Sequence, residues 1–504
     1  MTHRRILKVG ACLLLVGLII GCATARIHRH PHELRFTPLK FAPPKAERTV
    51  LNNGIVLYVL EDHDLPLFNA VASFRAGSIY EPADKVGLAS LTGTVARTGG
   101  TTSMTGDEID DELEFMAGSV EINVVREGAV GALNVLAKNM NRGLEIFADV
   151  LRNPVFSEDK IDLAKKAALE EIRRRYDTPD SIAAAEFPKL IYGENSVWAR
   201  FSTETTINDI SRDDLIQFHK KYYVPNNVIL GISGDFNKEQ LIAKVNALFG
   251  GWSPAEVSFP RVEDEKPMSV HSVNYIYKDV NQSSILMGHL GIRRHNPDEI
   301  SVEIMNYILG WGGFTSKLWK EVRQDRGLAY DVFGGITAGL DYGVFEAGCQ
   351  TSGRTTCEAI TVIRDVITEM TESPPSDAEL ALAKEGRLNR FVFNFASTAQ
   401  IVRQRVTLEF LGYPLDYLDT YEAKIAAVTR DDVHRVATTY LHPDRLVVLV
   451  VGNSAQFDKP LSTLGEVNAI EIPRNAASSA LMERTVPVFG YAPPSTLLFA
   501  RIQR

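Results

Sequence analysis

The stretch "ISRDDLIQFHKKYYVPNNVILGISGDF", residues 210–236, recurs later in the chain as "VTRDDVHRVATTYLHPDRLVVLVVGNS", residues 428–454. The second copy lies 218 residues after the first, and this offset holds for an Arg-Asp-Asp triplet, a tyrosine, a proline and a glycine. Each copy predicts a capped helix, a proline turn and a buried strand rich in Val, Ile and Leu. A repeat of this length without a gap indicates a duplicated unit.

The repeat extends upstream with a looser match. In the first half a strand at 67–77 precedes a helix that ends at Gly99-Gly100. In the second half a strand at 283–292 precedes a helix that ends at Gly312-Gly313. We therefore predict an α+β fold of two homologous domains, each with an antiparallel or mixed sheet packed with helices. The predicted segments are a signal peptide at 1–21, a tether at 22–44, a first domain at 45–255, a linker at 256–269, a second domain at 270–455 and a tail at 456–504.

Length and composition set broad limits on function. The 504 residues, 45% of them hydrophobic, are enough for two domains with separate cores. The net charge of −9 is spread along the chain without a basic block, which argues against nucleic-acid binding. Cys349 and Cys357 have neither zinc-ribbon spacing nor the C-x-x-C spacing of a redox pair. A disulfide between them and two buried thiols both fit the sequence.

The first 25 residues, "MTHRRILKVGACLLLVGLIIGCATA", have the pattern of a secretory signal. Their apolar run at 9–20 is shorter than the roughly 20 residues that a membrane-spanning helix needs. The run ends in Ile-Ile-Gly-Cys, which resembles a bacterial lipobox, and Ala23 follows the cysteine in place of Asp. We therefore predict a lipid anchor on Cys22 and a periplasmic protein attached to the outer membrane. The alternative is a plain secretory signal with an incidental cysteine.

Two further segments carry a family resemblance. "GSIYEPADKVGLASL", from residue 77, resembles the pattern G-S-x-x-E-P-x-x-x-x-G-L-A-H-x-x-E-H. "GGFTSKLWKEVRQDRGLAYDV", from residue 312, resembles G-G-x-x-S-x-L-x-x-x-x-R-x-x-x-G-L-x-Y-x-V. Both patterns are those of the insulinase or pitrilysin family, which includes the mitochondrial processing peptidases. The resemblance covers nearly the whole mature chain and implies the duplicated α/β roll of these metallopeptidases.

In active members of this family the first segment is an inverted zincin motif, H-x-x-E-H, and a later helix adds a glutamate ligand. Carried over to this chain, the two histidine positions are Ser90 and Thr94, and the position of the general base is Gly93. The distal glutamate, 77 residues further on, is retained as Glu171. Two hydroxyl groups cannot replace two imidazoles as zinc ligands. We therefore predict no metal site and no catalytic residue in this chain alone, and leave open whether it acts as an enzyme.

Alternatives remain for the zinc-motif positions. Ser90 or Thr94 could act as a nucleophile if a base lay within reach, although no G-x-S-x-G motif supports this role. Glu171 could form ordinary surface pairs with Arg174 and Arg175, at i+3 and i+4 on its helix. The other histidines beyond the tether are scattered singly, and we expect surface or core roles for them; they are His63, His219, His271, His289, His295, His434 and His442.

The second motif retains its functional-looking residues. Arg323 and Tyr330 match the arginine and tyrosine that, in active members, face the zinc from the C-terminal domain and hold the substrate carbonyl or its oxyanion. A guanidinium offers forked donors to carbonyl oxygens, and a phenol can donate to developing negative charge. Gly312 and Gly313 resemble a glycine-rich substrate loop of the processing peptidase's non-catalytic subunit. The alternatives are a surface arginine, a core tyrosine and a tight turn between helices.

These observations predict a non-catalytic subunit of an insulinase-type zinc metallopeptidase complex. The resemblance implies a partner with an intact zinc motif, as a heterodimer, and a peptide substrate. Zinc is then expected in the partner and no cofactor in this chain. The alternatives are a structural or binding lipoprotein without a proteolytic role, and a peptidase that uses unrecognised chemistry.

Overall fold

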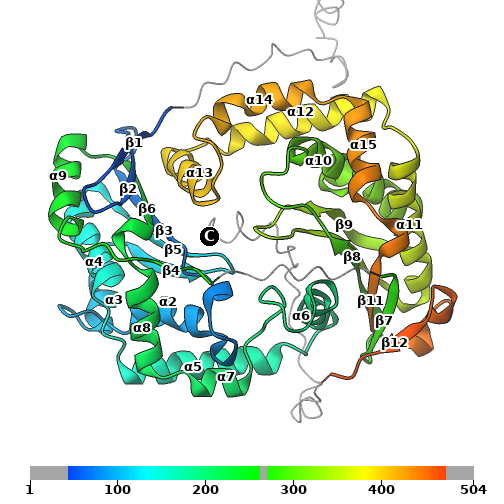
Figure 1. Cartoon of the computed structure of the whole chain (residues 1–504), viewed down its shortest axis with the longest axis horizontal. Helices are drawn as coiled ribbons and strands as arrows, with labels where there is room; N and C mark the ends of the chain where they lie inside the picture. The colour runs from blue at the N-terminus through cyan, green and yellow to red at the C-terminus, as the bar shows by residue number, and fades with distance from the viewer. Residues whose placement is uncertain (1–43, 261–269, 473–504) are drawn as a thin grey trace, which may run out of the picture. The chain divides into compact units, whose positions relative to one another are not determined.

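A mixed β-sheet lies at the centre of each half of the chain in the computed structural model, which describes residues 44–260 and 270–472 (Figure 1). The strands of the first sheet are β1 (Glu47–Val50), β2 (Val56–Glu61), β3 (Leu67–Phe74), β4 (Ser119–Val124), β5 (Ala129–Leu136) and β6 (Val228–Gly234). Those of the second are β7 (Ser272–Tyr277), β8 (Gln282–Leu290), β9 (Ala329–Thr337), β10 (Val344–Ser352), β11 (Val447–Gly452) and β12 (Val467–Ala469).

The two sheets share the topology of five of their six strands. Their strand orders are β1-β2-β6-β3-β5-β4 and β12-β7-β11-β8-β10-β9. In each sheet a parallel pair, β2–β6 or β7–β11, adjoins antiparallel strands. The sheets differ at one edge, because β1 runs antiparallel to β2 whereas β12 runs parallel to β7. The predicted fold class, two homologous α+β domains with mixed sheets, is confirmed.

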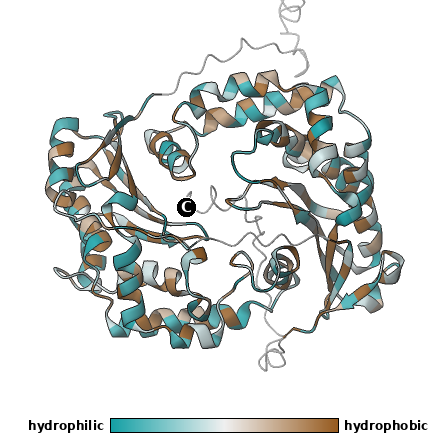
Figure 2. Ribbon diagram, in the orientation of Figure 1, coloured by the Kyte–Doolittle hydropathy of each residue, from teal (hydrophilic) through white to brown (hydrophobic). Residues whose placement is uncertain are grey.

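Helices flank both sheets and carry hydrophilic as well as hydrophobic residues along their length (Figure 2). In the first half they are η2 (Ser78–Tyr80), η3 (Ala83–Lys85), α2 (Leu88–Thr98), α3 (Gly106–Phe115), η4 (Ala137–Asn139), α4 (Met140–Arg152), α5 (Glu158–Arg174), α6 (Pro179–Tyr192), α7 (Glu204–Asp209), α8 (Arg212–Tyr222), η5 (Pro225–Asn227) and α9 (Lys238–Phe249). In the second half they are α10 (Glu299–Asn306), η6 (Tyr307–Trp311), η7 (Gly313–Thr315), η8 (Trp319–Asp325), η9 (Gly353–Thr355), α11 (Thr356–Glu372), α12 (Asp377–Phe393), α13 (Thr398–Phe410), α14 (Tyr417–Ala427), α15 (Arg430–Tyr440), η10 (Pro443–Arg445), η11 (Ser454–Gln456) and η12 (Leu461–Thr463).

The repeated stretch folds as the sequence predicts, into α8 and β6 in one copy and α15 and β11 in the other. Each helix begins with a capping box, which explains the shared Arg-Asp-Asp triplet. The Ser211 hydroxyl accepts from the Asp214 backbone N–H, and the Asp214 carboxylate accepts from the Ser211 N–H at 2.7 Å. Thr429 and Asp432 repeat this arrangement. The last aspartate of each triplet therefore satisfies backbone donors that the first helical turn leaves unpaired.

One helix of each domain packs on the sheet of the other domain. Helix α6 lies against β8 and β11, and α13 lies against β6, β3 and β2 (Figure 1). The two helices occupy equivalent places in the repeat, since α6 begins at residue 179 and α13 at residue 398. The domains are therefore joined by a reciprocal exchange of helices.

The contacts of the two exchanged helices differ. Helix α6 contributes Phe187 and other apolar side chains to a buried cluster with Leu449 and Val451 of β11. Helix α13 contributes Val402 and Val406 to a smaller cluster. These apolar contacts bury the face of each helix that its own sheet leaves uncovered.

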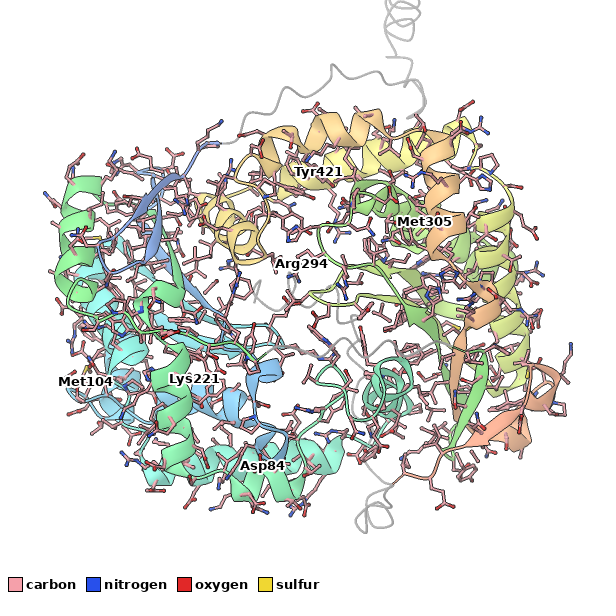
Figure 3. All side chains as sticks on the ribbon, viewed as in Figure 1. Asp84, Met104, Lys221, Arg294, Met305 and Tyr421 are labelled. Carbon is pink, nitrogen blue, oxygen red and sulfur yellow. The ribbon has the colours of Figure 1, made fainter. Side chains whose placement is uncertain are left out.

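Polar contacts add to this junction. Glu409 of α13 accepts from Arg48 at 2.7 and 2.9 Å and from the Tyr58 hydroxyl at 2.5 Å. Arg294, labelled in Figure 3, donates both arms of its guanidinium to Glu127 of the β4–β5 turn at 2.9 Å. The side chains of this second pair are only 9% and 20% exposed, and a paired charge of this kind is costly to break on one side.

Candidate functional site

Helix α2, which carries the zinc-motif positions, is held at its start by a buried carboxyl group. Gly87 caps the helix with φ of 107°, a left-handed conformation that suits glycine. The Glu81 carboxylate accepts from the backbone N–H groups of Gly87 at 3.0 Å and Ala89 at 2.6 Å. Burial raises the pKa of Glu81 to about 7, against the opposing effect of these two donors. Glu81 therefore fixes the position of α2 relative to the loop before it.

The zinc-motif positions do not form a metal site. Ser90 and Thr94 are exposed on one face of α2, whereas Gly93 is buried where α2 packs against β4. A Cβ atom at Gly93 would lie 2.6 Å from Cγ2 of Val124 and 3.2 Å from Cγ2 of Ile122. The space that a general-base side chain needs is thus filled by the neighbouring strand. These residues do not fit a zinc ion.

Glu171 lies on α5, which packs against α2. Its side chain is exposed and has no ion pair or hydrogen bond with any residue that the structure describes. The expected surface pairs with Arg174 and Arg175 are wrong, because Arg175 instead donates to the backbone oxygen of Ser202 at 2.8 Å. Among the described residues, no group of three or more His, Cys, Asp or Glu side chains is placed to hold a metal ion.

Arg323 of η8 lies against Tyr330, which is at the start of β9. Cζ of Arg323 is 4.5 Å from the ring centroid of Tyr330 and 4.5 Å from that of Trp319. The ring of Phe314 lies 5.2 Å from the same atom. Tyr330 and Phe314 are 83% and 65% exposed, so the cluster meets solvent. We call these four residues the arginine–aromatic cluster. Its rings fix the guanidinium by cation–π contact and leave the Tyr330 face of the cluster open.

The backbone before Arg323 is irregular in a way that positions it. Arg323 lies in η8, and both η8 and the earlier segment η6 have π-helical geometry. Such geometry is rare, is usually confined to short segments and is frequent at functional sites. Between η6 and η8, Gly312 and Gly313 form a tight turn, in which the Ser316 N–H donates to the Gly313 oxygen at 2.9 Å. Gly313 has a φ of 56°, in the left-handed region that residues with a side chain rarely adopt. The glycine pair thus serves as a turn between two helical segments.

The sequence analysis missed Trp319 and Phe314. Trp319 stands four residues before Arg323, a spacing that places two side chains on one helical face. That spacing could have predicted the contact. Phe314 lies outside this helical segment, packed edge-on against Trp319 at a centroid distance of 4.7 Å. Its approach to Arg323 depends on the glycine turn, which the sequence left as two alternatives.

The remaining predicted residues have ordinary environments or lie outside the described residues. Cys349 and Cys357 are buried free thiols, and the Cys357 thiol donates to the Lys459 backbone oxygen at 3.1 Å. Cys22 and the tether up to residue 43 lie outside the described residues. In the part of the chain that the structure describes, no helix has the length and apolar character to cross a membrane.

Comparison with known proteins agrees with this geometry. Residues 69–197 match the profile described as insulinase, peptidase family M16, and residues 209–387 match that of the peptidase M16 inactive domain. The chain belongs to peptidase family M16. The resemblance predicted from the two motifs is therefore confirmed.

The relatives of this chain include proteins named as zinc proteases and a protein named as a non-peptidase homologue. An uncharacterised zinc protease of Rickettsia bellii is 28% identical over 306 residues, which cover 60% of this chain and 72% of the relative. A non-peptidase homologue of Helicobacter pylori is 23% identical over 401 residues, which cover 78% of this chain and 90% of the relative.

Solved M16 structures share the fold. The peptidase M16 inactive domain of Pseudomonas fluorescens superposes with a TM-score of 0.75 at 26% identity, covering 83% of this chain and 100% of that one. The periplasmic protease PqqL of Escherichia coli superposes with a TM-score of 0.70 at 13% identity. That match covers 87% of this chain and 50% of PqqL, so this chain corresponds in fold to half of that longer protein.

Proposed function

We propose that this chain is the non-catalytic subunit of an M16 zinc metallopeptidase complex in the bacterial envelope. The observation that carries the proposal is the contrast within the chain. Its zinc-motif helix has neither ligands nor space for a general base, while Arg323 and Tyr330 form an ordered, exposed pair. A chain that keeps only this pair can contribute to peptide cleavage only beside another chain that binds zinc.

In this complex Arg323 and Tyr330 act on the substrate peptide. The guanidinium, held between the rings of Trp319 and Tyr330, directs N–H donors at a carbonyl oxygen. The Tyr330 hydroxyl donates to the negative charge that develops on this oxygen in the transition state. Zinc and the general base belong to the partner, an M16 chain with an intact H-x-x-E-H motif.

The proposed location rests on the N-terminal sequence. The apolar run that ends in Ile-Ile-Gly-Cys fits a lipidated Cys22, with the domains in the periplasm and the anchor in the outer membrane. Replacement Cys22→Ala should abolish lipid attachment and release the protein from the membrane fraction. If membrane fractionation is the same for Cys22→Ala and for the wild type, the anchor proposal is wrong.

The test of the complex is reconstitution. The mature chain is co-expressed with an M16 chain that has an intact H-x-x-E-H motif, and the product is analysed by size-exclusion chromatography with light scattering. We expect a 1:1 complex that cleaves unfolded peptides, with zinc in the partner, while each chain alone is nearly inactive. If the partner alone cleaves as fast as the mixture, the catalytic role is excluded and the structural or binding alternative is favoured.

A further inference from the structure

A cavity of about 390 Å³ lies in the first domain, away from the arginine–aromatic cluster. The end of α5, helix α6 and the segment that leads into α7 form its walls. It is large enough for a small ligand, since ligand sites start at about 300 Å³. Its apolar lining includes Ala83, Val86 and Phe201.

Two arginine side chains in this wall lack acidic partners. Arg175 donates to the backbone oxygen and the hydroxyl of Ser202, at 2.8 and 3.4 Å, and its Cζ lies 5.3 Å from the Phe201 ring centroid. Arg200 donates only to the Asn195 backbone oxygen, at 3.5 Å. Neither arginine forms an ion pair with any carboxylate of the described residues. Both arginine residues are partly buried, and the contact of Arg175 with Ser202 is more buried than that of Arg200 with Asn195. Two arginines therefore line one cavity without a directly paired carboxylate.

The other charged groups around the cavity do not supply this counter-charge. Lys189 is already paired with Glu186 at 2.7 Å. Glu81 feels the positive charge of Arg200, but its carboxylate is engaged by the start of α2. Glu194 lines the cavity, is exposed, and lies beyond ion-pair distance of both arginines. The lining thus contains more positive than negative side chains, which favours an anion in the cavity.

We propose that this cavity binds the oxyanion group of a small ligand, either a carboxylate or a phosphate. A guanidinium presents parallel N–H donors that match two oxygens of such a group. The free donors of Arg175 and Arg200 supply the polar half of the site, and Phe201, Ala83 and Val86 supply an apolar wall for the rest of the ligand. This site lies in the first domain and does not depend on the proposed role in peptide cleavage.

Isothermal titration calorimetry on the full mature chain tests the proposal with two probes. One is inorganic phosphate, and the other is a short acetylated peptide with a free C-terminal carboxylate, compared with its C-terminal amide. We expect at least one probe to bind at low ionic strength, with affinity that falls as salt is added. Binding of phosphate or of the carboxylate peptide each supports the site, and identifies which oxyanion it prefers.

Matched variants decide whether this cavity is responsible. Arg200→Gln should weaken binding about 10- to 100-fold, the range expected for loss of a charge-assisted hydrogen-bonding group. Arg174→Gln removes an exposed arginine next to the site but outside its lining, and should leave affinity unchanged. Glu194→Gln removes a nearby negative charge and should tighten binding about two- to five-fold.

Two results would overturn the proposal. One is the absence of binding of either probe at millimolar concentration. The other is equal affinity for the wild type, Arg200→Gln and Arg175→Gln, provided that circular dichroism shows these variants to be folded.

Discussion

Helix α2 of the first domain and the segment from Phe314 to Tyr330 of the second both carry family motifs. The functional positions of the two motifs differ in how they are packed. On α2 the side chains that would act are absent, and Val124 of β4 fills the space beside Gly93. In the second segment Arg323 is held by aromatic rings and remains accessible beside the exposed Tyr330. In the first motif the position of the general base is buried against β4, while the second motif keeps Tyr330 at the surface beside Arg323.

This difference distinguishes residues that are needed for the fold from residues that are placed to contact a ligand. The segment from Glu81 to Gly87 is needed for the fold, because its carboxyl group and its left-handed glycine start α2. Nothing in the packing of the second domain requires Tyr330 to be 83% exposed, so its placement there costs burial of an aromatic ring. An exposed aromatic residue that orders an arginine is better explained by an encounter with a ligand.

The largest effect that would test this contrast is on turnover by the reconstituted complex. Arg323→Ala should lower kcat by about 100- to 1,000-fold, the usual loss when a transition-state donor is removed. Tyr330→Phe should lower kcat in the same direction. The control is Arg326→Ala, which removes an exposed arginine three residues after Arg323 that pairs with Glu321. Steady-state kinetics equal to wild type for Arg323→Ala would show that both motifs serve only the fold.

A second prediction concerns the pH dependence of stability, measured by urea unfolding between pH 4.5 and 8. The pKa of Glu81 is about 7 in the folded chain and about 4.5 when unperturbed. The folded state therefore retains a proton on Glu81 that the unfolded state releases in this range, so the contribution of Glu81 to stability is greatest below about pH 4.5 and is lost as pH rises through 7. This pKa shift of Glu81 corresponds to a change of about 3 kcal/mol in its contribution to the free energy of unfolding. His219 and His289, whose pKa burial lowers to about 4, contribute in the opposite direction, so the effect of Glu81 is measured as the difference between variant and wild type.

Glu81→Gln should remove this contribution, so the stability of the variant relative to wild type should increase as pH rises from 4.5 to 8. Part of the dependence should remain, because burial also raises the pKa of Glu346 to about 7. Glu171→Gln, at an exposed glutamate, is the control and should follow the wild-type profile. A stability difference between Glu81→Gln and wild type that does not change with pH would contradict the buried, proton-retaining state of this carboxyl group at the start of α2.

A third prediction asks whether the lost zinc motif can be restored. The triple variant Ser90→His, Gly93→Glu, Thr94→His should bind no stoichiometric zinc and should lose about 1–3 kcal/mol of unfolding free energy, because a side chain at 93 meets Val124. The double variant Ser90→His, Thr94→His should keep its stability, since both positions are exposed. Tight zinc binding by the triple variant, measured by metal analysis, would show that the site was only missing its ligands.

The smallest expected effect is that of Glu171→Gln on peptide cleavage by the complex. Because Glu171 is exposed and without a partner among the described residues, we expect a change in kcat/KM of less than about two-fold. A loss of ten-fold or more would mean that this carboxylate reaches the substrate or the partner.

Much of this architecture could be predicted from the sequence because it depends on local chemistry. The capping boxes at Ser211 and Thr429 and the strands that follow them are short-range features with clear signatures. The juxtaposition of Arg323 and Tyr330 came from the family pattern. Their spacing alone does not place the Arg323 guanidinium over the Tyr330 ring.

The features that could not be predicted involve contacts between distant segments. Helices α6 and α13 have little separation of polar and apolar faces, so their sequences do not show that each packs on the sheet of the other domain. The contact of Val124 with Gly93 joins β4 to α2, and no local pattern encodes it. The failed pairing of Glu171 with Arg175 has the same cause, because Ser202, far along the chain, provides the better acceptor.

The exchange of α6 and α13 also bears on how such a chain arose. If the two halves descend from one ancestral unit, a single copy would have exposed the apolar face of this helix unless a second copy covered it. That ancestor would have been an obligate two-fold dimer, stable only through mutual exchange of one helix. Joining the copies in one chain replaced an encounter between molecules with a high effective concentration. It also freed each copy to change separately, so that one motif could be lost while the other was kept.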